Sequence, residues 1–269
     1  MKNIVNGTWL KEKMVKDNLI ILDIRANFDD YKSQHIKGAQ HVSMKEVAAS
    51  EVSEHGGRTP MPDIERFVED MMNLGISDDS IVLIYDNGNL DRAGRVWWLL
   101  KYIGKEDIFV LEGGIDKWID DGGETTIEIP KANRSNKLSL NINEEIKVDM
   151  EYVRDAINSD TSAIVDARAY KRYTGEVEPL DKKAGRIPSA LSYPWTDLIK
   201  DGEIISKEEL KENFEDLKKY DEVIVYCGSG VTATVDYLLM EEVGLEPKLY
   251  LGSFSDWISY DENEIEVGD

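Results

Sequence analysis

At 269 residues the chain is long for a single hydrophobic core, so two domains of ordinary size are expected. Its hydrophobic fraction of 41%, with six tryptophans and twelve tyrosines, excludes an intrinsically disordered protein. A net charge of −22 argues against nucleic acid or an anionic membrane surface as a partner.

No apolar run is long enough to span a bilayer, and the first residues lack the apolar stretch of a signal peptide. We therefore expect a cytoplasmic protein. The chain has one cysteine, Cys227, which excludes an internal disulfide and a thiolate metal cluster. Its three histidines form no close metal-ligand pattern. We expect neither a metal nor a cofactor.

In the first half, strand-like and helix-like segments alternate. The apolar run 19–25 ends in Asp23-Ile-Arg25 and predicts a strand. Residues 62–75 begin with Pro and Asp and space their apolar side chains for one face of a helix. The β-branched run 81–88 predicts a strand that is buried on both faces. Such alternation predicts an α/β fold with a mainly parallel sheet flanked by helices.

A polar stretch with Gly and Pro follows, and it predicts a linker over 123–144. The second half returns to the same alternation, with a helix expected over 207–220. The predicted domains are therefore 1–122 and 145–269.

The second half repeats the motifs of the first in the same order, at offsets of roughly 140 to 150 residues. The matched segments are 19–25 with 163–168, 35–39 with 186–190, 81–88 with 223–230, and 109–118 with 249–258. This order predicts a duplicated domain, in which Asp86 stands where the second copy has Cys227.

The strongest local signal is the loop that follows the strand-like run 223–226. Cys227 leaves the strand, Gly228 and Gly230 allow a tight turn, and a helical stretch begins at Ala233. Backbone amides and the positive end of the helix dipole would favour a thiolate nucleophile there. The alternative is a buried structural cysteine. A phosphatase loop of the Cys-x5-Arg type is excluded, because Ala233 stands where the arginine is needed.

These motifs resemble the rhodanese superfamily, in particular its two-domain 3-mercaptopyruvate and thiosulfate sulfurtransferases. Residues 227–233, Cys-Gly-Ser-Gly-Val-Thr-Ala, are similar to the active loop of the 3-mercaptopyruvate type. The two Asp-x-Arg motifs, residues 35–39, 95–98 and 252–257 are also similar, so the resemblance covers essentially the whole chain. It implies tandem rhodanese-like domains, of which the first is catalytically silent.

The resemblance also implies an activity of the EC 2.8.1 type. Sulfane sulfur from 3-mercaptopyruvate or thiosulfate would become a persulfide on Cys227 and pass to cyanide, a small thiol or a reduced dithiol protein. The acceptor must come from outside, since no second cysteine is present. Two alternatives are a thiosulfate:cyanide sulfurtransferase and a persulfide carrier for a partner protein. The loop expected to bind the persulfide comprises Gly228, Ser229, Gly230, Val231 and Thr232.

Two further residues acquire catalytic roles from the resemblance. His35 matches a histidine of the first domain that relays protons through the loop serine, here Ser229. Asp23, Asp29 or Asp30 could orient the imidazole. A purely structural role for His35 is the alternative.

The residues around the loop favour 3-mercaptopyruvate as the donor. Thiosulfate-type loops carry basic residues after the cysteine, whereas Gly228 and Ser229 are neutral. Arg172 matches the arginine that binds the donor carboxylate, and a guanidinium suits such a group. The second such arginine of the family falls near 178–180, where this chain has Glu-Pro-Leu. The residues that could replace it are Arg186, Arg92 and Arg95.

The remaining motif residues are expected to be structural. The pairs Asp23/Arg25 and Asp166/Arg168 should form ion pairs that fix strand ends. The tryptophans of the motifs should serve packing. These are Trp97, Trp98, Trp195 and Trp257.

Overall fold

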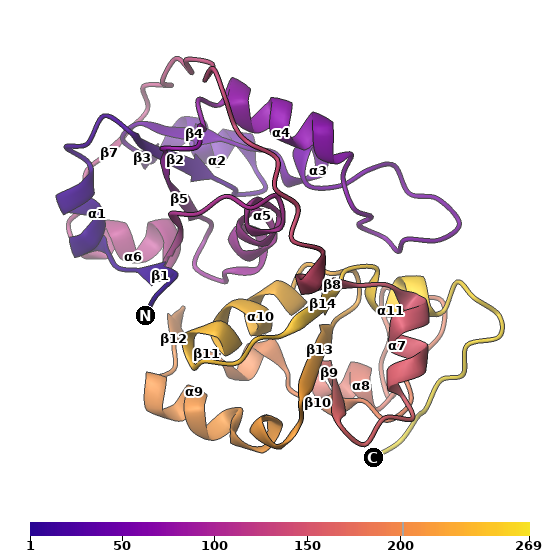
Figure 1. Cartoon of the computed structure of the whole chain (residues 1–269). Helices are drawn as coiled ribbons and strands as arrows, with labels where there is room; N and C mark the ends of the chain where they lie inside the picture. Colours follow the sequence, from indigo (N-terminus) through magenta and orange to yellow (C-terminus); the bar gives the residue numbers. More distant parts are fainter. Residues whose placement is uncertain (201) are drawn as a thin grey trace. The chain divides into compact units, whose positions relative to one another are not determined.

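The computed structural model describes residues 1–200 and 202–269, which form two compact units (Figure 1). The first unit contains residues 1–49, 62–143 and 202–204. The second contains residues 50–61, 144–200 and 205–269. In the described part of the chain, no helix is both long and apolar enough to cross a membrane.

The first unit is built on a five-stranded sheet whose neighbouring strands are all parallel. The strands lie in the order β1-β6-β5-β2-β4, and the middle strands are almost entirely buried. A second, antiparallel pair joins β3 to β7. The strands are β1 (Ile4–Val5), β2 (Leu19–Asp23), β3 (His35–Ile36), β4 (Ala39–His41), β5 (Ile81–Tyr85), β6 (Ile108–Leu111) and β7 (Thr125–Thr126). The short strand β12 (Glu203–Ile204) also belongs to this unit.

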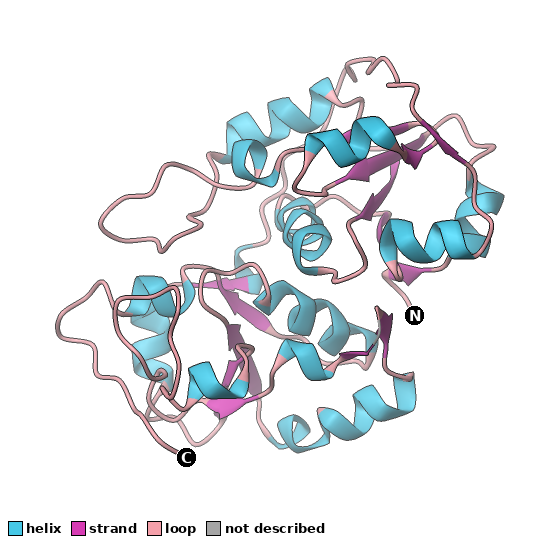
Figure 2. Cartoon of the chain, turned by 180° about the vertical axis from the view of Figure 1, so that it is seen from behind, coloured by secondary structure: helices cyan, strands magenta, loops and turns pink. Residues whose placement is uncertain are grey.

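Helices flank the sheet of the first unit (Figure 2). The predicted helix over 62–75 is confirmed as α4, in which the Asp63 carboxylate accepts a hydrogen bond from the Arg66 amide at 2.8 Å. It ends before Gly75, whose φ of +88° closes the helix. The helices are α1 (Gly7–Lys13), α2 (Phe28–Ser33), α3 (Met44–Val47), α4 (Ile64–Asn73), α5 (Asp91–Tyr102) and α6 (Gly114–Asp120).

The second unit has a five-stranded parallel sheet in the order β8-β14-β13-β9-β10. Its strands are β8 (Lys147–Val148), β9 (Ser162–Asp166), β10 (Leu191–Ser192), β11 (Ile199–Lys200), β13 (Glu222–Tyr226) and β14 (Lys248–Tyr250). Its helices are α7 (Met150–Ala156), α8 (Tyr170–Tyr173), α9 (Lys207–Asn213), α10 (Ala233–Glu242) and α11 (Ser253–Trp257). Three short 3₁₀ helices are η1 (Glu144–Ile146), η2 (Trp195–Asp197) and η3 (Glu215–Lys219).

The two sheets have the same topology. Strands that come at the same place along the two halves of the chain occupy the same position in the two sheets. Read across the sheet, β1, β6, β5, β2 and β4 of the first unit correspond to β8, β14, β13, β9 and β10 of the second. Asp86 follows β5 as Cys227 follows β13. The predicted α/β fold and the duplication are confirmed.

The Asp-x-Arg motif ends the second strand of each unit in the same way. Arg25 donates from Nη2 to Asp23 at 2.7 Å, and Arg168 donates from Nη2 to Asp166 at 2.6 Å. Burial by itself would lower the pKa of Arg168, but the Asp166 carboxylate outweighs it and raises that pKa above its ordinary value. These ion pairs confirm the structural interpretation of the motif.

A tyrosine completes each of these ion-pair clusters. Tyr85 donates to the Asp23 carboxylate at 2.6 Å, and Tyr226 donates to that of Asp166 at 2.7 Å. Three of the four motif tryptophans are buried, as expected for packing residues, and Trp195 is half-buried.

Two segments differ from what the pattern indicates. The helix expected over 207–220 is broken into α9 and η3, because Phe214 turns fully into the core and the tighter 3₁₀ turn also buries Leu217. Backbone amides of the predicted linker 123–144 donate hydrogen bonds to carbonyl groups of the first unit. Its backbone is anchored there by contacts such as the Ser135 amide to the Met72 carbonyl at 2.9 Å.

Candidate active site

Cys227 lies directly after β13, and only 1% of it is exposed. Its amide donates to the Ser253 hydroxyl at 3.1 Å, and the same hydroxyl lies 4.0 Å from the Cys227 sulfur. Ser253 has a left-handed backbone with a φ of 58°, which aims its side chain at the cysteine. The nucleophile predicted from the sequence is therefore held at the carboxyl end of a buried strand.

Helix α11 fixes the start of the loop. The Phe254 amide donates to the Cys227 carbonyl at 3.0 Å, and the Ser255 amide donates to the Gly228 carbonyl at 3.0 Å. These bonds hold the carbonyl groups of Cys227 and Gly228 against α11. The short helix α11 thus sets the direction of the loop amides.

The loop amides form a group of donors. Among the described residues, the amides of Gly228, Ser229, Val231 and Thr232 have no hydrogen-bond acceptor. Helix α10 begins directly after them at Ala233 and adds the positive end of its dipole. The arrangement suits an anion beside the Cys227 sulfur.

The corresponding loop of the first unit already contains a carboxyl group that accepts hydrogen bonds from the loop amides. One Asp86 oxygen accepts hydrogen bonds from the amides of Gly88 at 2.8 Å and Leu90 at 3.2 Å, and the other accepts from Ala93 at 3.1 Å. Burial raises the pKa of the Asp86 carboxyl above its ordinary value, and the three amides act in the opposite direction. The first unit shows that this loop geometry receives an acceptor group at the cysteine position.

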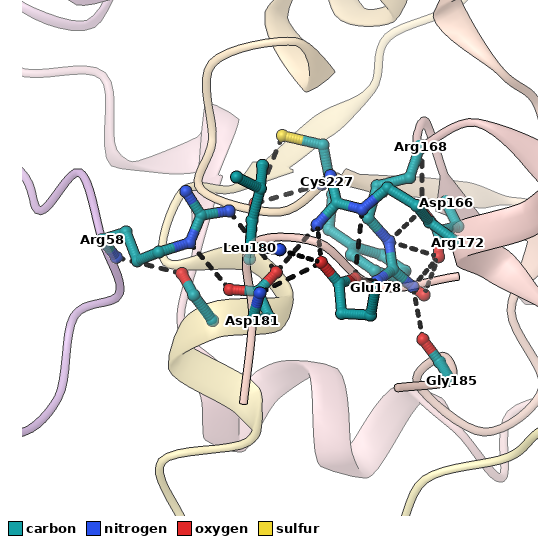
Figure 3. A network of polar contacts seen from close by, with 12 residues as sticks. Arg58, Asp166, Arg168, Arg172, Glu178, Leu180, Asp181, Gly185 and Cys227 are labelled. Atoms are coloured by element: carbon teal, nitrogen blue, oxygen red, sulfur yellow. Dashed lines mark hydrogen bonds and ion pairs between the residues drawn. The ribbon is translucent and has the colours of Figure 1, made fainter. Parts of the chain in front are cut away.

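Arg172 lies beside the loop, as the resemblance implies. A methyl group on Gly228 would lie 3.1 Å from its Nη2 atom and 3.3 Å from Nη1. Arg172 donates from Nη2 to Glu178 at 2.8 Å and to Asp181 at 2.9 Å (Figure 3). The guanidinium therefore stands next to the loop that follows Cys227 and is held by two carboxylates.

Glu178 stands where the family's second arginine is missing, and it has a different task here. It pairs with Arg172 and also lies 3.3 Å from Nη1 of Arg168. Burial alone would raise the pKa of Glu178, but the amides of Leu180 and Asp181 and the Arg172 guanidinium lower it below its ordinary value. Glu178 is therefore a charged anchor for two arginines.

One residue at the site was not found from the sequence. Arg58 donates from Nε to Asp181 at 2.7 Å, and its Nη2 atom lies 2.7 Å from the position of a methyl group on Gly228. It comes from the first half of the chain, about 170 residues before the cysteine. The two glycines before Arg58 indicate a turn, but they carry no information about Asp181, a partner 123 residues further along the chain.

The predicted proton-relay residues lie as follows. Ser229 is half-buried in the loop. His35 is fully buried in the first unit, with Nδ1 2.7 Å from the Tyr31 carbonyl oxygen and Nε2 3.1 Å from that of Glu128. Its ring is oriented by these two carbonyls and by stacking on Tyr31, in place of Asp23, Asp29 or Asp30. This geometry favours the structural alternative for His35.

Of the three arginines considered as replacements for the missing one, Arg186 and Arg95 have other partners. The guanidinium of Arg186 lies 4.4 Å from the ring centroid of Tyr173, pairs with Glu266 at 3.4 Å and hydrogen-bonds the Gly268 carbonyl. Arg95 is buried in the first unit and donates to the Ala48 carbonyl at 3.0 Å. Arg92, also in the first unit, is half-buried.

The carboxyl group of Asp236 also lies close to the cysteine. Asp236 of α10 is fully buried, and neither of its oxygens has a hydrogen-bond partner in the described part of the chain. Burial raises its pKa well above the ordinary value, and the nearby Cys227 adds to the shift. The shift favours the uncharged form of this carboxyl group.

Comparison with known proteins agrees with this geometry. The rhodanese-like domain family matches residues 6–121 and 149–260. The chain is 33% identical to the 3-mercaptopyruvate sulfurtransferase of Escherichia coli over 94% of either chain. It is 30% identical to the thiosulfate sulfurtransferase of Mus musculus, with 94% of this chain and 91% of that one covered.

A solved structure agrees as well. The crystal structure of SseA, a 3-mercaptopyruvate sulfotransferase from Escherichia coli, superposes with a TM-score of 0.82 at 31% identity. The match covers 95% of this chain and 100% of that one. The chain therefore belongs to the rhodanese family, as a tandem of two rhodanese-like domains.

Proposed function

We propose that this rhodanese-family sulfurtransferase takes sulfane sulfur from 3-mercaptopyruvate, holds it as a persulfide on Cys227, and passes it to a thiophilic acceptor. The observation that carries the proposal is the loop itself. Its nucleophile is followed by four backbone amides that have no acceptor among the described residues. In the first unit, the equivalent donors are taken by Asp86.

The reaction has two displacement steps. The Cys227 thiolate attacks the sulfur of 3-mercaptopyruvate, the carbon–sulfur bond breaks, and its electron pair leaves with the pyruvate enolate. The enolate takes up the thiol proton and becomes pyruvate, which leaves an anionic persulfide on Cys227. An acceptor such as cyanide then attacks the outer sulfur, and the sulfur–sulfur bond breaks to regenerate the thiolate. The loop amides would stabilise the persulfide anion.

The charges beside the loop support the choice of donor. Gly228 and Ser229 are neutral, whereas thiosulfate-type loops of the family carry basic residues directly after the cysteine. Arg172 lies next to Gly228 and can bind a carboxylate. Since Cys227 is the only cysteine, the acceptor is external, and a small thiol or a reduced dithiol protein would serve.

The proposal is tested by mass spectrometry and steady-state kinetics. Incubation with 3-mercaptopyruvate alone should add the mass of one sulfur atom to the protein, and a thiol reductant should remove it. Cys227→Ala should show neither the added sulfur nor turnover with cyanide, and Arg66→Ala provides a control, because Arg66 pairs with Asp70 on the surface of the first unit. Turnover that survives in Cys227→Ala would refute the persulfide.

A side-by-side measurement of kcat/KM for 3-mercaptopyruvate and thiosulfate decides the donor. A preference for thiosulfate would assign the protein as a thiosulfate:cyanide sulfurtransferase. A labile persulfide without turnover on small acceptors would instead indicate a carrier that serves a partner protein.

A further inference from the structure

Residues 50–61 come from the first half of the chain but pack within the second unit. The Gly56 amide donates to the Asp256 carboxylate at 2.7 Å, and the Arg58 amide donates to the Ser255 hydroxyl at 3.0 Å. Asp256 and Ser255 belong to α11, and the amide of Ser255 also holds the Gly228 carbonyl. Helix α11 therefore connects the backbone of residues 50–61 to the loop that carries Cys227.

The Arg58 side chain continues from this anchored backbone toward Gly228. Asp181 accepts hydrogen bonds from Arg58 Nε at 2.7 Å and from Arg172 Nη2 at 2.9 Å. One carboxylate thus holds two guanidinium groups from distant segments (Figure 3). Both guanidinium groups lie next to Gly228. A methyl group on this residue would be 2.7 Å from Nη2 of Arg58 and 3.1 Å from Nη2 of Arg172.

The cations are more accessible than the anions that hold them. The side chains of Asp181 and Glu178 are 1% and 3% exposed, whereas those of Arg172 and Arg58 are 17% and 36% exposed. A ligand that approaches from solvent therefore meets guanidinium groups first. In the described residues, Nη1 of neither arginine donates a hydrogen bond to protein, so each retains donors for a ligand.

We infer that Arg58 is a second donor-binding arginine, which acts with Arg172 to bind the carboxylate of the sulfur donor beside Cys227. Asp181 positions both guanidinium groups and is a positioning residue. Two forked guanidinium groups bind a carboxylate more firmly and with a more defined orientation than one. This inference rests on the proposed function and names the residue that determines its specificity for carboxylate-bearing donors.

The experiment compares two donors that differ only in the carboxylate, 3-mercaptopyruvate and mercaptoacetone, with cyanide as acceptor. Arg58→Ala should lower kcat/KM for 3-mercaptopyruvate about ten- to a hundredfold, chiefly through KM, since it removes charge-assisted hydrogen bonds to the donor. The rate with mercaptoacetone should change less than about threefold, because that donor has no carboxylate for the arginine to bind. Arg58→Lys keeps the charge and should fall between wild type and Arg58→Ala.

Arg66→Ala is the matched control, because Arg66 pairs with Asp70 on the surface of the first unit. It should leave both donors unaffected, and thermal unfolding should show that the Arg58 variants are folded. An equal loss with both donors, or no loss with either, would overturn the role of Arg58 while the proposed function stands. Wild-type enzyme that turns over mercaptoacetone or thiosulfate but not 3-mercaptopyruvate would overturn the donor assignment, and the role of Arg58 with it.

Discussion

Gly228 shows how a single residue determines what its neighbours can do. Its backbone lies outside the left-handed region, so conformational freedom does not require glycine here. The requirement is space, because two guanidinium groups approach where any other residue would place its Cβ. A basic side chain at this position, as in thiosulfate-type loops, would displace the arginines of this site.

We predict that Gly228→Ala weakens donor binding while it leaves the stability of the fold almost unchanged. Its methyl group would lie 2.7 Å from Arg58 Nη2, the far end of a flexible side chain that can move aside. The free energy of unfolding should therefore change by less than about 1 kcal/mol. The KM for 3-mercaptopyruvate should rise about tenfold, because the displaced arginine no longer meets the donor. Denaturant unfolding and steady-state kinetics on the same preparation measure both quantities, and an unchanged KM would contradict the prediction.

At the scale of the element, one strand–loop–helix unit occurs twice with different residues at its turn. After β13 the turn carries Cys227 and leaves its amides to an incoming anion. After β5 the turn carries Asp86, whose own carboxyl accepts three amides. The same backbone thus serves chemistry in one unit and stability in the other.

We predict that Asp86→Ala destabilises the protein by on the order of 3 kcal/mol, because buried amides lose their acceptor. Asp86→Asn keeps one acceptor oxygen and should lose less. Urea unfolding of the three proteins measures the difference. An alanine variant as stable as wild type would show that water or a solution anion replaces the carboxyl without cost.

At the scale of the whole molecule, the chain leaves the first unit for residues 50–61 and returns to it at residue 62. Gly57 makes this excursion possible. It has a φ of +77°, and a Cβ there would lie 2.4 Å from the Gly252 carbonyl oxygen at the start of α11. Gly56 has a similar φ of +95°, but its nearest neighbour, the Pro60 Cβ, is at 3.6 Å. The two glycines therefore share a backbone conformation and differ in packing.

This difference allows a matched test of the segment. Both Gly56→Ala and Gly57→Ala should carry a backbone penalty on the order of 1 kcal/mol. Only Gly57→Ala should also push the segment away from α11, increase proteolytic cleavage within 50–61, and raise the KM for 3-mercaptopyruvate through Arg58. Limited proteolysis and kinetics of the two variants provide the measurement. Equal behaviour of the two variants would show that close packing against Gly252 is unimportant.

Much of this protein was predictable from the sequence, because the signals are local. Burial on both faces gives β5 and β13 their β-branched runs, and helix periodicity together with an acidic cap marks α4. The repeat in the same order revealed the duplication, and the residues around Cys227 predicted the nucleophile. Each of these properties depends on neighbours within a few residues or on a repeated pattern.

Only the tertiary structure decided how the charges around the nucleophile are arranged. The sequence indicated Arg172 and left the second cation among Arg186, Arg92 and Arg95, whereas Arg58 lies beside Gly228 in the second unit. Arg58 reaches Gly228 because a loop from the other half of the chain is anchored on α11, and Glu178 and Asp181 hold the arginines from behind. Ion pairs between residues more than a hundred positions apart leave no periodicity in a sequence, so only the folded chain could reveal them.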